Sequence, residues 1–167
     1  MQNTGGPGFT VNSFAGQSFT TPATGGPWNH LTFNFFSPND ASSVAAGTAY
    51  LLTPQYTGAP GNLSGQPGFL GASTGIVSGA YVFALPLALQ LNTQYFLYED
   101  TPLTISAGNT ISGGQAYVAG NGVTNFTPAN GAVSFDFRVS GDTVPEPATL
   151  SLFRLGLAVL VGLRPRR

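Results

Sequence analysis

The sequence predicts an all-β chain: an antiparallel β-sandwich of jelly-roll-like type, followed by a short C-terminal transmembrane helix. Between residues 9 and 140, short apolar or alternating runs are separated by Gly, Pro and Asn, which is typical of strands and turns. The 42% hydrophobic content and 13 Phe supply enough apolar surface to fold one domain. The last 24 residues differ sharply, with an apolar run that ends in arginines.

The clearest strand is expected at 133–139, where Val133, Phe135, Phe137 and Val139 alternate with polar residues. We expect these four side chains to face inward. The three polar residues between them, Ser134, Asp136 and Arg138, are expected to face outward. In the same way Leu31, Phe33 and Phe35 should face the core, and 81–85 is apolar enough to be a central strand. The expected strands are 9–14, 17–21, 31–36, 48–53, 76–85, 95–98, 115–118 and 133–139.

Two long connections interrupt these strands, 53–68 and the glycine-rich stretch 106–130. Long loops on a rigid scaffold often carry binding residues. We therefore expect any ligand contacts of the sandwich to lie in such loops.

Charge divides the chain into two unlike parts. Residues 1–143 carry five carboxylates and one cation, Arg138, whereas residues 144–167 carry Glu146 and four arginines. A domain with one cation in residues 1–143 cannot neutralise several phosphates, so nucleic-acid binding is excluded. Cysteine is absent, which excludes disulfides, thiolate zinc sites and thiol catalysis.

The tail contains three blocks in a fixed order. A linker with a Pro-Glu-Pro motif covers 142–147, an apolar stretch covers 148–163, and a basic end covers 164–167. As a helix, 148–163 would be about 24 Å long, against a hydrocarbon core of roughly 30 Å, so it spans a membrane only marginally. Arg154 inside this stretch would cost about 2.5–3.5 kcal/mol on insertion. The alternative is a short helix packed on the sandwich.

This order of blocks resembles the PEP-CTERM sorting signal of exported proteins in Gram-negative bacteria. The resemblance implies a sorting motif and a basic stop that remains cytoplasmic. It also implies export, a transient stay in the inner membrane, processing by an exosortase-type membrane protease, and a final place at the cell surface or in an extracellular matrix of exopolysaccharide, as in biofilms. The motif residues are Val144, Pro145, Glu146 and Pro147, and the basic stop is Arg164, Arg166 and Arg167.

The body, 5–141, resembles the choice-of-anchor domains, which are β-rich exported modules found with interchangeable anchors. The matching parts are the Gln-Ser-Phe-Thr run from Gln17, the run 92–98, and the final Phe-x-Phe-x-Val run before the tail. This resemblance implies no enzymatic activity. An exported protein should begin with a basic segment and an apolar run, and residues 1–8 have neither, so we expect the true start to lie upstream.

Residues that could carry chemistry are few, and we expect neither an enzyme nor a cofactor. Glu99 and Asp100 are expected to form a solvated turn; with Asp40 they are weak candidates for calcium ligands. No serine triad is visible around the one histidine, His30.

The candidate ligand contacts are Trp28, His30 and Tyr56. The expected function is a non-catalytic surface or matrix protein. One alternative is a glycan-binding module, favoured if Trp28 and Tyr56 are exposed on one side. The other is a polysaccharide hydrolase, which needs two carboxylates across a groove.

Overall fold

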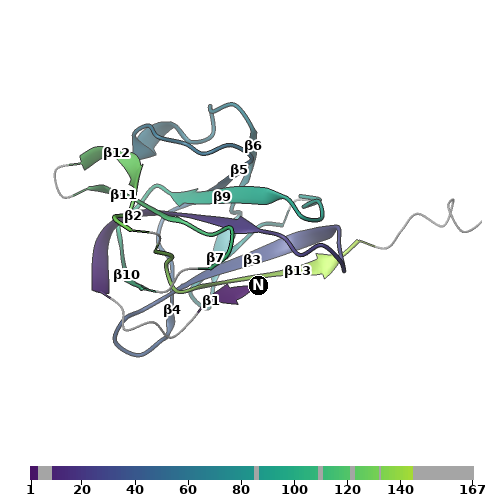
Figure 1. The fold of residues 1–167 in the computed structure, drawn as a ribbon, viewed down its shortest axis with the longest axis horizontal. Coiled ribbons are helices and arrows are strands. Elements are labelled where there is room, and N and C mark those ends of the chain that lie inside the picture. Colours follow the sequence, from purple (N-terminus) through teal and green to yellow (C-terminus); the bar gives the residue numbers. More distant parts are fainter. Residues whose placement is uncertain (4–8, 85–86, 109–110, 121–122, 132, 145–167) are drawn as a thin grey trace, which may run out of the picture.

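The computed structural model describes residues 1–3, 9–84, 87–108, 111–120, 123–131 and 133–144. Within these ranges the chain is all-β, and the single helical element is one 3-10 turn, η1 (Pro60–Asn62). The strands form two antiparallel sheets that lie over one another (Figure 1), an arrangement consistent with a β-sandwich. The predicted fold class is confirmed at this level. No helix in the described part is long and apolar enough to cross a membrane, and 148–163 lies outside that part.

The first sheet has the strand order β1-β13-β3-β8-β7, with β4 also paired to β3. Its centre is β3, which pairs with β13 on one edge and with β8 and β4 on the other. The strands are β1 (Gln2–Asn3), β3 (Trp28–Phe36), β4 (Ser43–Val44), β7 (Gly75–Val77), β8 (Ala80–Val82) and β13 (Phe137–Thr143).

The second sheet has the order β12-β11-β2-β9-β5-β6, with β10 also paired to β2. Its longest strand, β2, pairs through its first half with β10 and through its second half with β9. The strands are β2 (Phe9–Thr20), β5 (Ala49–Leu52), β6 (Phe69–Ala72), β9 (Gln94–Glu99), β10 (Leu103–Ala107), β11 (Ala116–Gly120) and β12 (Val123–Pro128).

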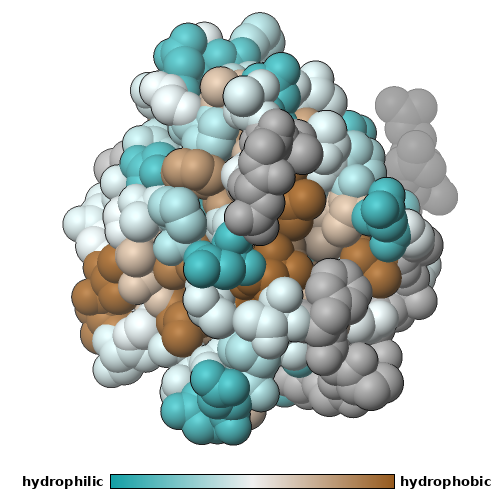
Figure 2. Space-filling model, turned by 90° about the vertical axis from the view of Figure 1, so that its left-hand side faces the viewer, coloured by the Kyte–Doolittle hydropathy of each residue, from teal (hydrophilic) through white to brown (hydrophobic). Residues whose placement is uncertain are grey.

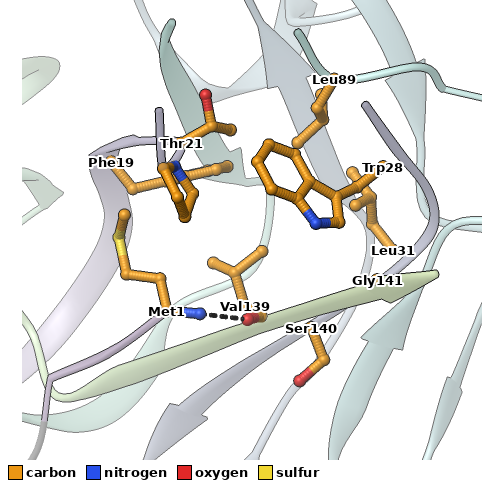
Figure 3. A pocket seen from close by; sticks show the side chains of 10 residues that line it. Met1, Phe19, Thr21, Trp28, Leu31, Leu89, Val139, Ser140 and Gly141 are labelled. Carbon is orange, nitrogen blue, oxygen red and sulfur yellow. Dashed lines mark hydrogen bonds between the residues drawn. The ribbon is translucent and has the colours of Figure 1, made fainter. Parts of the chain in front are cut away.

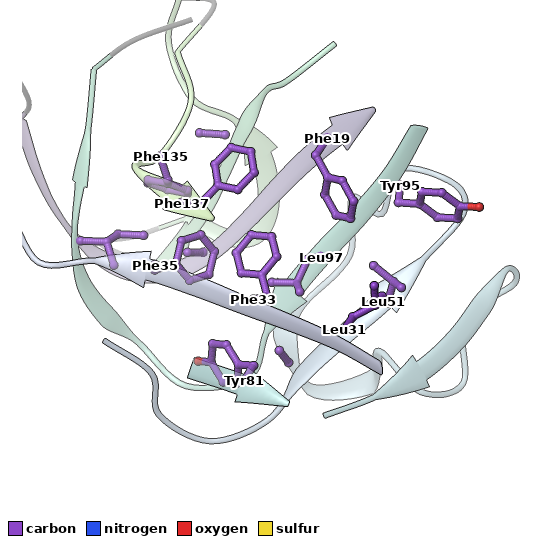
Figure 4. Packing of buried hydrophobic residues seen from close by; sticks show 14 of the residues in the cluster. Phe19, Leu31, Phe33, Phe35, Leu51, Tyr81, Tyr95, Leu97, Phe135 and Phe137 are labelled. Carbon is purple, nitrogen blue, oxygen red and sulfur yellow. The ribbon is translucent and has the colours of Figure 1, made fainter. Parts of the chain in front are cut away.

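Phenylalanines dominate the core between the sheets (Figure 4). The rings of Phe33 and Phe137 stack with centroids 5.4 Å apart and an interplanar angle of 2°. Phe35 meets Phe135 edge to face at 5.7 Å, a geometry that aromatic pairs favour. The inward orientation predicted for Leu31, Phe33 and Phe35 is therefore confirmed.

A second hydrophobic cluster lies on the other face of the second sheet. On β9, Tyr95 and Leu97 face the core, so Phe96 and Tyr98 face away from it. The loop after β5 and strand β12 cover this face and bury both side chains. We call this set the outer aromatic cluster; its buried residues are Leu52, Leu63, Phe96, Tyr98, Tyr117, Ala119 and Phe126.

Several predicted strand boundaries were wrong. The two strands expected at 9–14 and 17–21 are one strand, β2, and the strand expected at 76–85 is the hairpin β7–β8, which turns at Ser78 and Gly79 with φ of 50° and 75°. The glycine-rich connection contains β12 and the end of β10. Glycine content misled the prediction, because Gly108, Gly113 and Gly114 lie between the strands and Gly120 is the last residue of β11.

The last strand also differs from its prediction. It begins at Phe137 rather than at residue 133, and Ser134 and Asp136 are buried rather than outward-facing. Backbone groups hold this entry segment: Asp136 N donates to Ser106 O at 2.8 Å. Arg138 is exposed as expected, but its Nε donates to Gln2 Oε1, and its guanidinium lies 5.7 Å from the centre of the Phe36 ring.

Candidate functional site

A pocket of about 290 Å³ opens between the two sheets beside Trp28. Phe19 of β2, Trp28 and Leu31 of β3, and Val139 of β13 form its walls, together with Leu89 from the connection between β8 and β9. Figure 3 shows these side chains arranged around the cavity. The remaining lining residues are Met1, Thr21, Pro22, Ser140 and Gly141.

Trp28 reaches this pocket because β3 contains a β-bulge. The ladder between β3 and β13 shifts register here, so Gly141 alone lies opposite both His30 and Leu31. His30 is the extra residue and has a φ of 47°, in the left-handed region. The bulge reverses the side-chain alternation, so Trp28 and Leu31 both line the pocket although they are three positions apart. Regular alternation would have turned Trp28 outward.

Neighbouring backbone fixes the position of Trp28. Its backbone N and O bond to Leu89 O and N at 3.1 and 2.8 Å. Gly26 lies against the indole ring: a Cβ atom there would come within 2.6 Å of the ring. The indole Nε1 makes no hydrogen bond with the described residues, and in Figure 3 it faces the pocket on the side of Val139.

His30, the second candidate contact, points away from this pocket. Its side chain is 56% exposed, and Nδ1 lies 3.5 Å from the carboxylate of Asp142, which is also exposed. An exposed pair of this kind contributes little to stability. The bulge therefore separates His30 from Trp28, although they are two residues apart in the sequence.

Tyr56, the third candidate contact, belongs to a different region. Its ring packs edge to face on Tyr98 and against Phe126, and its hydroxyl donates to Ala59 O at 2.8 Å. These contacts place Tyr56 on the outer aromatic cluster, on the face of the second sheet that is turned away from the core. Trp28 packs against the core between the sheets. The two aromatic residues therefore do not form one binding face.

Glu99 is fully buried, so the expected solvated turn was wrong. Oε1 accepts a hydrogen bond from Ala15 N at 2.9 Å, and Oε2 lies 2.9 Å from the Tyr81 hydroxyl. That hydroxyl donates to Ala46 O at 2.7 Å and accepts from Ala46 N at 3.1 Å. The hydroxyl has one proton for these two acceptors; when Glu99 is protonated it can donate in the bond they share, and the Tyr81 proton then goes to Ala46 O. Burial raises the pKa of Glu99 well above 4.5, consistent with a neutral carboxyl group.

Asp100 and Asp40 serve local structure. Asp100 accepts hydrogen bonds from Thr48 N at 2.8 Å and from the Tyr50 hydroxyl at 3.0 Å. Asp40 is exposed and accepts two bonds from Ser42, which lower its pKa. Within the described residues, no three His, Asp or Glu side chains come together in a way that could hold a metal ion.

A second pocket, of about 340 Å³, lies where β10 and β11 flank the first half of β2. Its lining includes Val11, Ala107, Val118 and Phe135. Neither this pocket nor the Trp28 pocket has a carboxylate among its described lining residues. The described part of the chain therefore places no acid–base pair in either cavity.

The sorting motif lies almost wholly outside the described residues. Of its four residues only Val144 is described, and its N–H donates to Pro27 O at 2.8 Å, next to Trp28. Pro145, Glu146, Pro147, Arg154 and the basic stop Arg164, Arg166 and Arg167 lie outside. The last described residue is thus bonded to Pro27, the residue before Trp28 in the sequence.

The sequence suggested Trp28 as a candidate ligand contact but did not predict the pocket that it lines. The inward orientation of Phe19 and Val139 follows from strand alternation, whereas Leu89 lies in a connection with no periodic signal. No pattern in the sequence predicted the bulge at His30.

No protein-family model, curated protein or solved structure matches this chain.

Proposed function

We propose that this chain is an exported, non-catalytic protein of the bacterial cell surface or extracellular matrix, sorted by an exosortase-type C-terminal signal. The observation that carries the proposal is the order of blocks in the tail: Pro145-Glu146-Pro147, the apolar stretch 148–163, and three terminal arginines. In this proposal 148–163 is a short transmembrane helix that holds the chain in the inner membrane until the protease acts near the tripeptide.

The domain 5–141 has few charged residues, which fits the proposed role as a matrix protein. Charged residues make up 7% of the chain, and none occurs between Asp40 and Glu99. On the face shown in Figure 2, weakly polar residues predominate and the hydrophobic residues form separate patches. A neutral surface of this kind suits a protein embedded in exopolysaccharide, the partner we propose. The strand order, with repeated crossings between the sheets, supports the jelly-roll-like description.

The test is fractionation of the full-length gene product in a bacterium that has an exosortase. The variants are Pro145→Ala and Glu146→Ala, with Thr143→Ser, at the exposed end of β13, as the matched control. We expect wild type and control to be processed and to reach the surface, and the two motif variants to remain uncut in the inner membrane. Processing of both motif variants at the wild-type level would contradict the proposal.

The two alternative functions receive no support from the site. A glycan-binding module needed Trp28 and Tyr56 on one exposed side, and they belong to separate clusters. A hydrolase needed paired carboxylates across a groove, and the described pocket linings contain none. A glycan array with the full chain separates the first alternative from the proposed function, because a purely structural body binds no glycan on it.

A further inference from the structure

The Trp28 pocket combines an apolar wall with an indole N–H group that has no acceptor among the described residues. Phe19, Leu31, Leu89 and Val139 contribute hydrocarbon surface, and Trp28 contributes both a ring face and its N–H group. An indole N–H in a partly buried position normally finds an acceptor. None of the described residues accepts from this one.

The polar residues of the lining are not available in the same way. Thr21 Oγ1 donates to Gln90 O at 2.6 Å and accepts from Thr93 N at 2.9 Å. The Ser140 hydroxyl projects from the opposite side of β13 to Val139 (Figure 3). The Met1 amino group donates one hydrogen bond to Val139 O at 2.8 Å. A sugar ring carries several hydroxyl groups, and the few polar groups of this lining could pair with only some of them, so the rest would lose water on entry without gaining a partner. The cavity therefore disfavours a saccharide.

The volume limits the size of a ligand. An apolar cavity of about 150 Å³ accommodates benzene. The Trp28 pocket, at about 290 Å³, is close to twice that size. It has room for two fused rings or for one ring with a short alkyl chain.

We propose that the Trp28 pocket binds a small organic molecule with a compact apolar body of about this size and one oxygen acceptor, which takes the hydrogen bond of the Trp28 indole N–H. The apolar body packs on Phe19, Leu89 and Val139, and the acceptor fixes its orientation. This inference is independent of the tail, so its failure would leave the proposed sorting function untouched.

The test uses the only tryptophan of the chain as a reporter. The full-length chain, labelled with ¹⁵N-tryptophan, gives a single indole N–H resonance in a ¹H–¹⁵N spectrum. The probes are 1-tetralone, a bicyclic ketone, and tetralin, which has the same skeleton without the oxygen. We expect 1-tetralone to move the indole resonance downfield in a saturable way. Tetralin should bind roughly three- to ten-fold more weakly, as expected for the loss of one hydrogen bond.

Two variants locate the site. Val139→Phe fills the pocket and should weaken the binding of both probes at least about ten-fold. The control, Val77→Phe, makes the same change on the exposed edge strand β7, away from the pocket lining, and should bind both probes like wild type. If Val139→Phe fails to fold, Trp28→Phe tests the donor instead. In that variant the two probes, followed through their own resonances, should bind equally.

Three outcomes would overturn the proposal. The first is an indole resonance that neither probe moves up to its solubility limit. The second is a folded Val139→Phe variant that binds both probes with the affinity of wild type. The third is a saturable response of the indole resonance to methyl β-glucoside but not to 1-tetralone, which would instead indicate a sugar site.

Discussion

The carboxyl group of Glu99 accepts a hydrogen bond from the backbone N–H of Ala15 at 2.9 Å, at the junction where β2 passes from one partner strand to the next. Residues 99–102 separate the paired residues of β9 and β10, whereas only residues 14–15 separate their partners on β2. Two residues are thus in excess on one side, and the ladder is interrupted. The Glu99 side chain supplies the acceptor that the interrupted ladder lacks for Ala15.

Glu99 should make the free energy of unfolding depend on pH. Its pKa is raised in the folded chain, so the folded state holds a proton that the unfolded state releases above about pH 4.5. The contribution is complete below pH 4.5 and is lost as pH rises toward the folded-state pKa. We therefore expect wild type to lose stability relative to Glu99→Gln as the pH is raised above 4.5, measured by urea unfolding.

The comparison with Glu99→Ala tests the hydrogen bonds themselves. Glutamine can donate to Tyr81 and accept from Ala15, whereas alanine does neither and leaves a buried N–H without an acceptor. Glu99→Ala should lower the free energy of unfolding by about 1–3 kcal/mol at pH 4.5 relative to Glu99→Gln. Parallel pH profiles of wild type and Glu99→Gln would show that Glu99 is not the titrating group.

Gly16 should tolerate no side chain. Gly16 pairs with Tyr98 across β2 and β9, and a Cβ atom on Gly16 would lie 2.3 Å from Cδ1 of that ring. Gly16→Ala should lower the free energy of unfolding by about 1–3 kcal/mol, because the buried ring must move. The matched control is Gly75→Ala on β7, where nothing lies within 4 Å of the added atom and the change should stay within about 0.5 kcal/mol. Equal effects in chemical denaturation would refute this account of the outer aromatic cluster.

The bulge at His30 should control the position of Trp28. A β-branched residue at a φ of 47° is strained, so His30→Val should cost about 1–2 kcal/mol and turn Trp28 toward solvent. The expected readout is a red shift of tryptophan emission in the folded protein. His30→Asn, which accepts the left-handed conformation, should keep the wild-type emission. A His30→Val protein with unchanged emission and stability would mean that the bulge does not aim Trp28.

Gln17 should be a polar residue that the core requires. It is fully buried; Oε1 accepts from Phe135 N at 2.8 Å, and Nε2 donates to Ser18 O at 2.7 Å and to the Ser134 hydroxyl at 3.3 Å. Gln17→Met keeps the length of the side chain but removes the amide, and should lower the free energy of unfolding by about 1–3 kcal/mol. Gln94→Met, at an exposed position of β9, is the control and should change it by less than about 0.5 kcal/mol. Calorimetry that finds the two variants equally stable would contradict a structural role for Gln17.

The fold class could be predicted because alternation is a local property. Leu31, Phe33 and Phe35 report a buried strand face without knowledge of their partners, and the structure buries all three. Glu99 and Ser134 could not be placed in this way. Their burial depends on partners far along the chain, Ala15 and Gln17, and on breaks in regular strand pairing.

The candidate site shows the same limit. Trp28 was proposed as a ligand contact because an aromatic residue with a polar edge is a common one. Its pocket depends on one extra residue in β3, and a single inserted position changes which side every earlier residue faces. His30 and Tyr56 were grouped with Trp28 by residue type alone, and the register and the second cluster separate them.

The central claim, that the tail is a sorting signal removed before the protein reaches the cell surface, is tested most directly by intact mass spectrometry of the protein recovered from the surface fraction. The account predicts a C-terminus at or near Pro145-Glu146-Pro147, without the apolar stretch 148–163 and the arginines that follow it. A surface protein whose mass still includes residues 148–167 would contradict it.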